Sequence, residues 1–284
     1  MLIAGPTASG KSALAIALAK ATGGVVVNAD SMQVYAGLRM LSARPTLGEE
    51  AQVAHRLYGF VDPVRAFSTG DYVRAVTPLL ADLKQRQQLA IIVGGSGLYF
   101  KALTDGLVAM PEISAAVMSE VEAMPDLHGW LQREDPASAF RLSPGDLPRL
   151  QRAAAVKLAT GRTLGDWQRE ATMPVLTAGR WKGLFLNRDR AWLYERINLR
   201  FETMLRYGAL DEARAIAALA LPPNRGVMKA HGLPHLLAYL RGEMALDEAI
   251  RLGQQDTRNY AKRQFTWARR YMGGWRWVDS VEPF

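Results

Sequence analysis

Short apolar runs alternate with helical patterns along the first hundred residues. Three runs predict buried strands: Met1–Ala4, Val25–Val27 and Ala90–Val93. Between the first two, Lys11–Ala21 is rich in Ala and Leu and predicts a helix. Ser68 or Thr69 could cap a second helix that runs to about Gln87. Strand, loop and helix in alternation predict an α/β fold with a parallel sheet flanked by helices.

The pattern changes in the middle of the chain. From Met110 to about Met173 there is no strand signal, and apolar residues recur at helical spacing, which predicts an all-helical insertion domain. Gly183–Leu186 could return one strand to the sheet, and from Arg190 onward the pattern is helical. We therefore expect a core domain of residues 1–109 and 174–284 and an insertion domain of residues 110–173.

Composition narrows the protein class. The 284 residues include no cysteine, which excludes disulfides and thiolate metal sites. No stretch approaches the ~20 apolar residues that span a bilayer, and no basic flank precedes the first apolar run, so we expect neither a membrane segment nor a signal peptide. These features fit a cytoplasmic protein.

The formal net charge of +8 fits either a soluble basic protein or one with a polyanionic partner. Its distribution favours the second interpretation. Residues 250–278 hold seven basic residues and one acid, Asp256, with six aromatic residues interleaved. Basic groups can neutralise phosphates, and aromatic rings can stack on bases or pack into a core.

A glycine-rich phosphate loop follows the first predicted strand. Residues 5–12 read GPTASGKS and satisfy the pattern G-x-x-x-x-G-K-[ST], which is typical of ATP-binding and other nucleotide-binding proteins. Backbone N–H groups and the Lys11 charge would hold phosphate oxygens, and the Ser12 hydroxyl is placed to meet Mg²⁺. The candidate phosphate ligands are Gly5, Thr7, Ala8, Ser9, Gly10, Lys11 and Ser12. The motif does not identify which phosphate compound binds.

One acidic residue stands at the end of a predicted strand. An ATPase or kinase needs an acid there to organise Mg²⁺, but Ala90–Val93 ends in Gly94. The strand that begins at Val25 does end in an acid, Asp30. From the residues alone, Asp30 could organise magnesium, act as a catalytic base or cap a turn.

Several ordered motifs resemble one enzyme family. They are GPTASGKS, NADSMQVYAGL at residues 28–38, ARPT at 43–46, HRL at 55–57, DP at 62–63, GGSGLYFKAL at 94–103, and Thr257-Arg258 followed by AKRQFTW at 261–267. Together they resemble the tRNA dimethylallyltransferases, also called tRNA isopentenyltransferases. The resemblance spans the whole chain in the same order.

This resemblance implies a P-loop-like α/β core with a helical insertion. It implies transfer of a dimethylallyl group from dimethylallyl pyrophosphate to N6 of the adenosine 3′ of the anticodon, with release of pyrophosphate and with Mg²⁺ as cofactor. The expected partners are the tRNA anticodon stem-loop and dimethylallyl pyrophosphate, and we expect a monomer.

The resemblance also assigns roles to individual residues. Asp30 matches the acid that contacts N6, where a carboxylate can accept a proton from the amine. Ser96 stands where the family commonly has Thr and keeps its hydroxyl, while Arg196 matches a pyrophosphate-binding arginine. The implied tRNA contacts are Asp30, Ser31, Met32, Gln33, Ser96, Pro148, Arg149, Leu150, Gln151, Arg152, Lys229, Lys262 and Arg263. The sequence departs from the family at Met118, Pro148 and Leu233, which puts individual tRNA contacts in doubt.

Three other functions compete. An isopentenyltransferase that acts on free adenine nucleotides would share the loop and the acid, but it needs neither the insertion nor the basic C-terminal region. A P-loop small-molecule kinase would transfer phosphate from ATP. A non-enzymatic RNA-binding protein would not need Lys11, Ser12 and Asp30 intact. His231 and His235 are four residues apart, but Pro234 and the lack of a nearby acid argue against a metal site.

Overall fold

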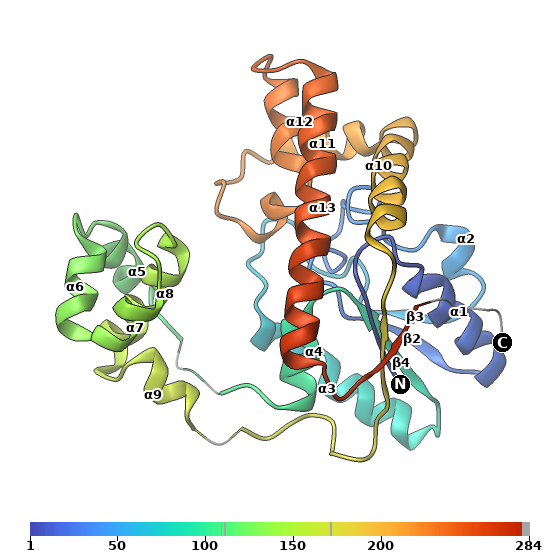
Figure 1. Cartoon of the computed structure of the whole chain (residues 1–284), viewed down its shortest axis with the longest axis horizontal. Helices are drawn as coiled ribbons and strands as arrows, with labels where there is room; N and C mark the ends of the chain where they lie inside the picture. Colours follow the sequence, from blue (N-terminus) through green and yellow to red (C-terminus); the bar gives the residue numbers. More distant parts are fainter. Residues whose placement is uncertain (109, 111, 171, 280–284) are drawn as a thin grey trace. The chain divides into compact units, whose positions relative to one another are not determined.

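The computed structural model describes residues 1–108, 110, 112–170 and 172–279 (Figure 1). They form two compact units, one made of Met1–Thr104 with the chain from Pro174 onward, and the other of Asp105–Met173. The second unit begins at Asp105, whereas the sequence pattern placed the start of the insertion at Met110.

The first unit is built on a six-stranded parallel sheet. The strands are β1 (Leu2–Ala4), β2 (Val25–Asn28), β3 (His55–Arg56), β4 (Ala90–Gly94), β5 (Gly183–Leu186) and β6 (Arg276–Val278). Their order is β3-β2-β4-β1-β5-β6, and every pair is parallel. The predicted α/β class is confirmed. The edge strands β3 and β6 were not predicted, and β6 contradicts the expectation that only helices follow Arg190.

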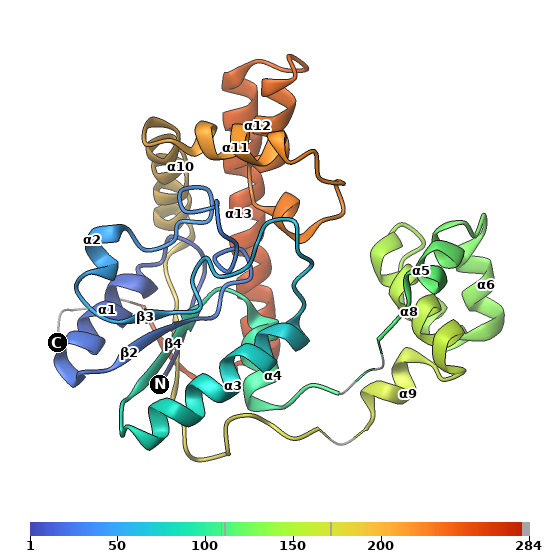
Figure 2. The same cartoon turned by 180° about the vertical axis from the view of Figure 1, so that it is seen from behind.

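Alternate residues of each strand face opposite sides of the sheet. Ile3, Val26 and Ile91 pack against α1 (Lys11–Thr22). Their neighbours Leu2 and Ile92 face the other side, which carries α3 (Thr69–Gln85) and α4 (Gly97–Thr104), as Figure 2 shows. The predicted cap of α3 is Ser68, whose hydroxyl accepts the Asp71 N–H in a capping box. Both faces of the sheet are therefore covered, which explains why its central strands are continuous apolar runs.

Helices of the C-terminal part complete the first unit. They are α10 (Arg190–Arg206), α11 (Ala209–Ala218), the 3₁₀ helix η1 (Gly226–Lys229), α12 (Leu233–Leu240) and α13 (Leu246–Tyr271), and a short α2 (Leu47–Glu50) lies between β2 and β3. The 26-residue α13 packs against α10, α12 and α4 (Figure 1). Leu233, a departure from the family, is fully buried in the first turn of α12.

The second unit contains only helices in its described residues, as predicted. They are α5 (Ala115–Glu122), α6 (Leu127–Glu134), α7 (Pro136–Arg141), α8 (Leu147–Thr160) and α9 (Leu164–Gln168). Its own core contains Val121, Leu131 and Leu150, and the partly buried Met118 packs against it. Pro148 lies in the first turn of α8, where a missing backbone N–H costs little. None of the helices in the described residues has the length and apolar character of a bilayer-spanning segment.

Candidate active site

The phosphate loop connects β1 to α1 at the carboxyl edge of the sheet. Gly10 has φ 93° and caps α1 without a side-chain hydrogen bond, so the first N–H groups of the helix are open to an anion. A Cβ atom at Gly5 would lie 2.9 Å from the buried Ser9 hydroxyl, which requires glycine there. Even Ala8 takes a left-handed φ of 65°. The loop therefore has the curled backbone that a phosphate group needs.

Lys11 supplies the first cation of the loop. Its ammonium donates to the Pro6 carbonyl at 3.1 Å. Burial lowers the pKa of Lys11 to about 8, a shift that the Asp30 carboxylate opposes and the Arg200 guanidinium adds to. The ammonium therefore lies in a poorly solvated place where a second anion would be stabilising.

Two arginines that the sequence motifs did not identify also reach the loop. The Arg200 guanidinium, on α10, donates to the Thr7 hydroxyl. Burial lowers the pKa of Arg200 to about 10, with Asp30 opposing the shift and Arg196 adding to it. Arg188, just before α10, donates to the Ser9 carbonyl at 3.1 Å. The loop is thus held by cations that come from a distant part of the chain.

Arg196, the predicted pyrophosphate ligand, lies elsewhere on α10. Its side chain is exposed, and its guanidinium carbon is 5.0 Å from the centre of the Trp192 ring. The structure brings Arg200 rather than Arg196 into contact with the loop, and the role of Arg196 stays a prediction. The signal for Arg200 was present, because it follows Arg196 by four residues and so belongs to the same stripe of the helix.

Asp30 lies in the loop after β2, and the buried Asn28 side chain holds its backbone. The Asp30 N–H donates to Asn28 Oδ1 at 2.8 Å, and Asn28 Nδ2 donates to the Asp30 carbonyl at 3.0 Å. Of the carboxylate oxygens, Oδ1 accepts the Met32 N–H at 3.0 Å, while Oδ2 faces Gly95. Asp30 therefore forms a turn with one oxygen and keeps the other for chemistry.

Ser96 connects this loop to the turn after β4. Its hydroxyl accepts the Ser31 N–H at 2.8 Å and donates to the Ser31 hydroxyl at 3.1 Å. Gln33 uses its amide to donate to the Ser42 and Ala43 carbonyls, so it shapes the loop that follows. The structure thus brings Ser31 and Ser96 to Asp30 but directs the amide of Gln33 into its own loop.

A small cavity of about 40 Å³ opens beside Asp30. Its polar lining includes Thr7, Asp30, Arg200, His231 and Tyr260, and its apolar lining includes Met32, Leu41, Ile197, Phe201 and Met204. A second cavity, of about 210 Å³, is lined by Gly5, Ser96, Arg263 and Trp267, and it shares Tyr260 with the first. A charged group and an apolar group could therefore be accommodated side by side at this edge of the sheet.

Several predicted tRNA contacts belong to the first unit and are exposed. Lys262 and Arg263 lie on α13, and Lys229 ends η1. The Arg263 guanidinium carbon is 5.7 Å from the centre of the Tyr260 ring. These side chains are accessible to a partner, and Arg263 lies next to the second cavity.

The predicted tRNA contacts of the insertion differ from one another in exposure and in pairing. Arg149 is exposed but pairs with Asp146 at 3.3 Å, and the Arg152 guanidinium reaches the Met110 sulfur at 3.5 Å. Gln151 is half-buried. Leu150 is only 1% exposed in the core of this unit, so its side chain does not fit the predicted role of a tRNA contact.

The two histidines of the C-terminal part have different surroundings. The His231 ring packs at a tilt of 38° against the Tyr260 ring with 4.3 Å between ring centres, and burial together with the Arg263 charge lowers the pKa of His231. His235 Nε2 lies 2.8 Å from Asp256 Oδ2, so the assumption that no acid is near was wrong. Among the described residues, no group of three or more His, Cys, Asp or Glu side chains could hold a metal ion.

Comparisons with known proteins identify the family of this chain. A model of the IPP transferase family matches residues 33–271. The tRNA dimethylallyltransferase of Rhodopseudomonas palustris (strain BisB18) is 54% identical over 98% of this chain and 90% of its own length. That of Nitrobacter hamburgensis is 51% identical over 99% of this chain and 91% of its own length.

Solved structures of the same family also match this chain. The full-length tRNA isopentenylpyrophosphate transferase from Bacillus halodurans has a TM-score of 0.70 and 32% identity, over 98% of this chain and 88% of that one. A eukaryotic dimethylallyltransferase described as acting on tRNA has a TM-score of 0.84 and 26% identity, over 99% of this chain and 73% of that one.

Proposed function

This chain belongs to the IPP transferase family of tRNA dimethylallyltransferases, and from that premise we propose that it transfers a dimethylallyl group from dimethylallyl pyrophosphate to N6 of the adenosine 3′ of a tRNA anticodon. The observation that carries the proposal is the cavity beside Asp30. It joins the Arg200 guanidinium and the phosphate loop to a partly apolar wall. A five-carbon chain attached to a pyrophosphate has the same two chemical halves.

The reaction is a displacement at the primary carbon of the prenyl group. The carbon–oxygen bond to pyrophosphate breaks as the carbon–nitrogen bond to N6 forms. Lys11, Arg200 and the N-terminus of α1 neutralise the charge that develops on the leaving group. Asp30 accepts the proton that N6 loses, and its Oδ2 is the oxygen without a backbone hydrogen bond.

Mg²⁺ is part of the proposal, because the residues present fit it. Ser12 is the second residue of α1 and follows Lys11. Mg²⁺ in phosphate sites usually takes few protein ligands and completes its shell with phosphate oxygens and water. When bound, the ion would neutralise pyrophosphate charge. Loss of activity in EDTA, with recovery on adding Mg²⁺, would support this role.

We propose the tRNA anticodon stem-loop as the acceptor, rather than a free nucleotide. The exposed Arg263 lines the same cavity as Ser96, and the exposed Lys262 precedes Arg263 on α13. Both cations can neutralise phosphates near the target base. A cytoplasmic monomer fits such a substrate, and light scattering would test the monomer.

One experiment separates the competing functions. The protein is incubated with dimethylallyl pyrophosphate, labelled in the prenyl group, and with either tRNA or AMP. We expect label in tRNA and none in AMP, whereas labelled AMP would favour a transferase for free nucleotides. A parallel incubation with γ-labelled ATP tests the kinase, and phosphate transfer without prenyl transfer would overturn the proposal.

A further inference from the structure

One glutamine of α13 lies between the ends of two neighbouring strands. Strands β1 and β4 are paired with Ala4 opposite Gly94, so the phosphate loop and the turn after β4 leave the sheet side by side. Gln264 Oε1 accepts the Thr7 N–H at 2.8 Å, and Gln264 Nε2 donates to the Gly95 carbonyl at 2.9 Å. The side chain therefore connects these two segments with one amide, and the residue is only 7% exposed.

The surroundings of Gln264 are built for a carboxamide. The Thr7 N–H needs an acceptor and the Gly95 carbonyl needs a donor, and an amide supplies both at a fixed separation. A Cβ atom at Gly95 would lie 2.2 Å from Gln264 Nε2, so this close approach requires glycine. Tyr260, one turn earlier on α13, donates to the same carbonyl at 3.4 Å.

Both ends of this bridge adjoin residues that shape the proposed site. Thr7 precedes Ala8, whose left-handed φ of 65° costs free energy and persists only where neighbouring contacts hold it. Gly95 precedes Ser96, whose hydroxyl holds Ser31 next to Asp30. Gln264 thus stands between the segment that grips the leaving group and the turn after β4, whose Ser96 holds the loop of Asp30.

We propose that Gln264 is a positioning residue, which sets the separation between the phosphate loop and the Asp30–Ser96 region and so aligns the leaving pyrophosphate with the attacking nitrogen. The inference rests on the proposed function. A displacement needs the nucleophile and the leaving group on opposite sides of one carbon, and a misplacement of about 1 Å can cost a rate factor of about 100. The amide itself touches neither bond that changes.

The first test replaces the amide with an apolar side chain of similar size, Gln264→Leu. With dimethylallyl pyrophosphate and tRNA we expect kcat to fall by about 100-fold, while the KM for tRNA stays within about threefold. The control is Gln254→Leu on the same helix, where the amide donates to the Asn198 carbonyl and to Glu202. A kcat that falls equally in both variants would mean that α13 packing, and not the bridge, is responsible.

A second variant keeps the test sharp if the leucine variant folds poorly. Gln264→Glu accepts the Thr7 N–H, but when ionised it cannot donate to the Gly95 carbonyl. At pH 7.5, where the carboxyl is ionised, we expect kcat to fall by about tenfold or more while the KM for tRNA stays within about threefold. An unchanged kcat in Gln264→Glu would overturn the proposal.

The two proposals fail in different ways. A wild-type protein that transfers no prenyl group to tRNA would overturn the proposed function. An active wild type with a Gln264→Leu variant of unchanged kcat would overturn only the positioning role.

Discussion

The two compact units carry opposite formal charges. The unit Asp105–Met173 holds seven basic and ten acidic residues, a formal charge of −3, whereas the rest of the chain holds 28 basic and 17 acidic residues, a charge of +11. The basic balance that predicted a polyanionic partner therefore belongs entirely to the core.

The cations also differ in their pairing. Three arginines of the insertion form ion pairs within their own unit: Arg149 with Asp146, Arg162 with Glu170 and Arg169 with Asp166. On α13, the exposed Lys262, Arg263, Arg269 and Arg270 form no ion pair in the part of the chain that the structure describes. An unpaired cation can neutralise a phosphate without first losing a partner. We infer that the core supplies most of the electrostatic attraction to RNA.

The largest expected effect comes from an acid of the core. Asp30→Asn removes the proton acceptor but keeps an oxygen for the Met32 N–H, so the turn survives. We expect kcat for prenyl transfer to fall by about 10²- to 10⁴-fold, with tRNA affinity unchanged. Asp146→Asn, an acid of the insertion, is the matched control and should leave kcat unchanged. Near-normal turnover by Asp30→Asn would refute the base assignment.

The second prediction compares cations directly. Replacing both Lys262 and Arg263 with Gln should weaken tRNA binding by about thirtyfold and reduce the slope of log K against log salt by about 2. Replacing Arg149 and Arg169 with Gln should change affinity by about threefold or less, because each is already paired with an acid. Fluorescence binding assays from 50 to 300 mM salt, a range of about sixfold in ionic strength, give both quantities. Equal losses of tRNA affinity in the two double variants would contradict the proposed difference between the cations of the core and those of the insertion.

The third prediction uses the lowered pKa of Lys11. Because that pKa is about 8, the ammonium of the free protein loses its proton as pH rises through 8. Affinity for inorganic pyrophosphate should therefore fall by about tenfold between pH 7 and 9, beyond the change seen in Lys11→Arg, which stays charged. Isothermal titration calorimetry measures the pyrophosphate affinity of the wild type and of Lys11→Arg at each pH. Lys157→Arg in the insertion, where the ammonium donates to the Gly161 carbonyl, should follow the wild type.

A contrast between central and edge strands explains which parts of the sheet the sequence could predict. The central strands were predicted because each is an apolar run buried on both faces. The edge strand β3 has only His55 and Arg56, and β6 contains Arg276 and Trp277, so neither shows the pattern of a buried strand. These strands form because a neighbouring strand offers unpaired backbone groups, which is a tertiary cause.

The residues of the site also fall into two groups, those that local motifs predict and those that only long-range packing brings together. The phosphate loop and Asp30 follow from local motifs, since a turn and the start of a helix create them. Gln264 meets Thr7 across 257 positions of sequence, and Arg200 meets the same residue across 193. Both contacts depend on how α10 and α13 pack on the sheet. No local pattern indicated Gln264, whereas helical spacing from the predicted ligand Arg196 pointed to Arg200 on the same helix.

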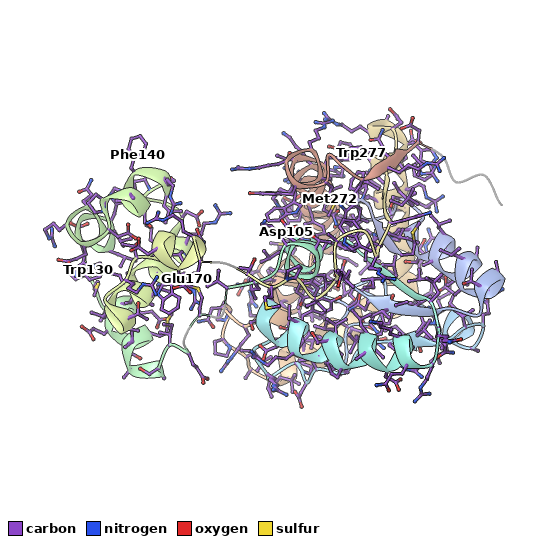
Figure 3. All side chains as sticks on the ribbon, turned by 90° about the horizontal axis from the view of Figure 1, so that it is seen from below. Asp105, Trp130, Phe140, Glu170, Met272 and Trp277 are labelled. Atoms are coloured by element: carbon purple, nitrogen blue, oxygen red, sulfur yellow. The ribbon has the colours of Figure 1, made fainter. Side chains whose placement is uncertain are left out.

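The smallest expected effect tests whether the insertion uses stacking in place of charge. Phe140 is 93% exposed on α7 and projects outward from its unit in Figure 3. Because it packs against little, Phe140→Ala should change the free energy of unfolding by less than about 0.5 kcal/mol. Since acids outnumber basic residues in its unit, we expect tRNA affinity to change by less than about twofold, as no phosphate contact is lost. A loss of about tenfold or more would match one stacked base and would show that the acidic unit binds RNA through its aromatic surface.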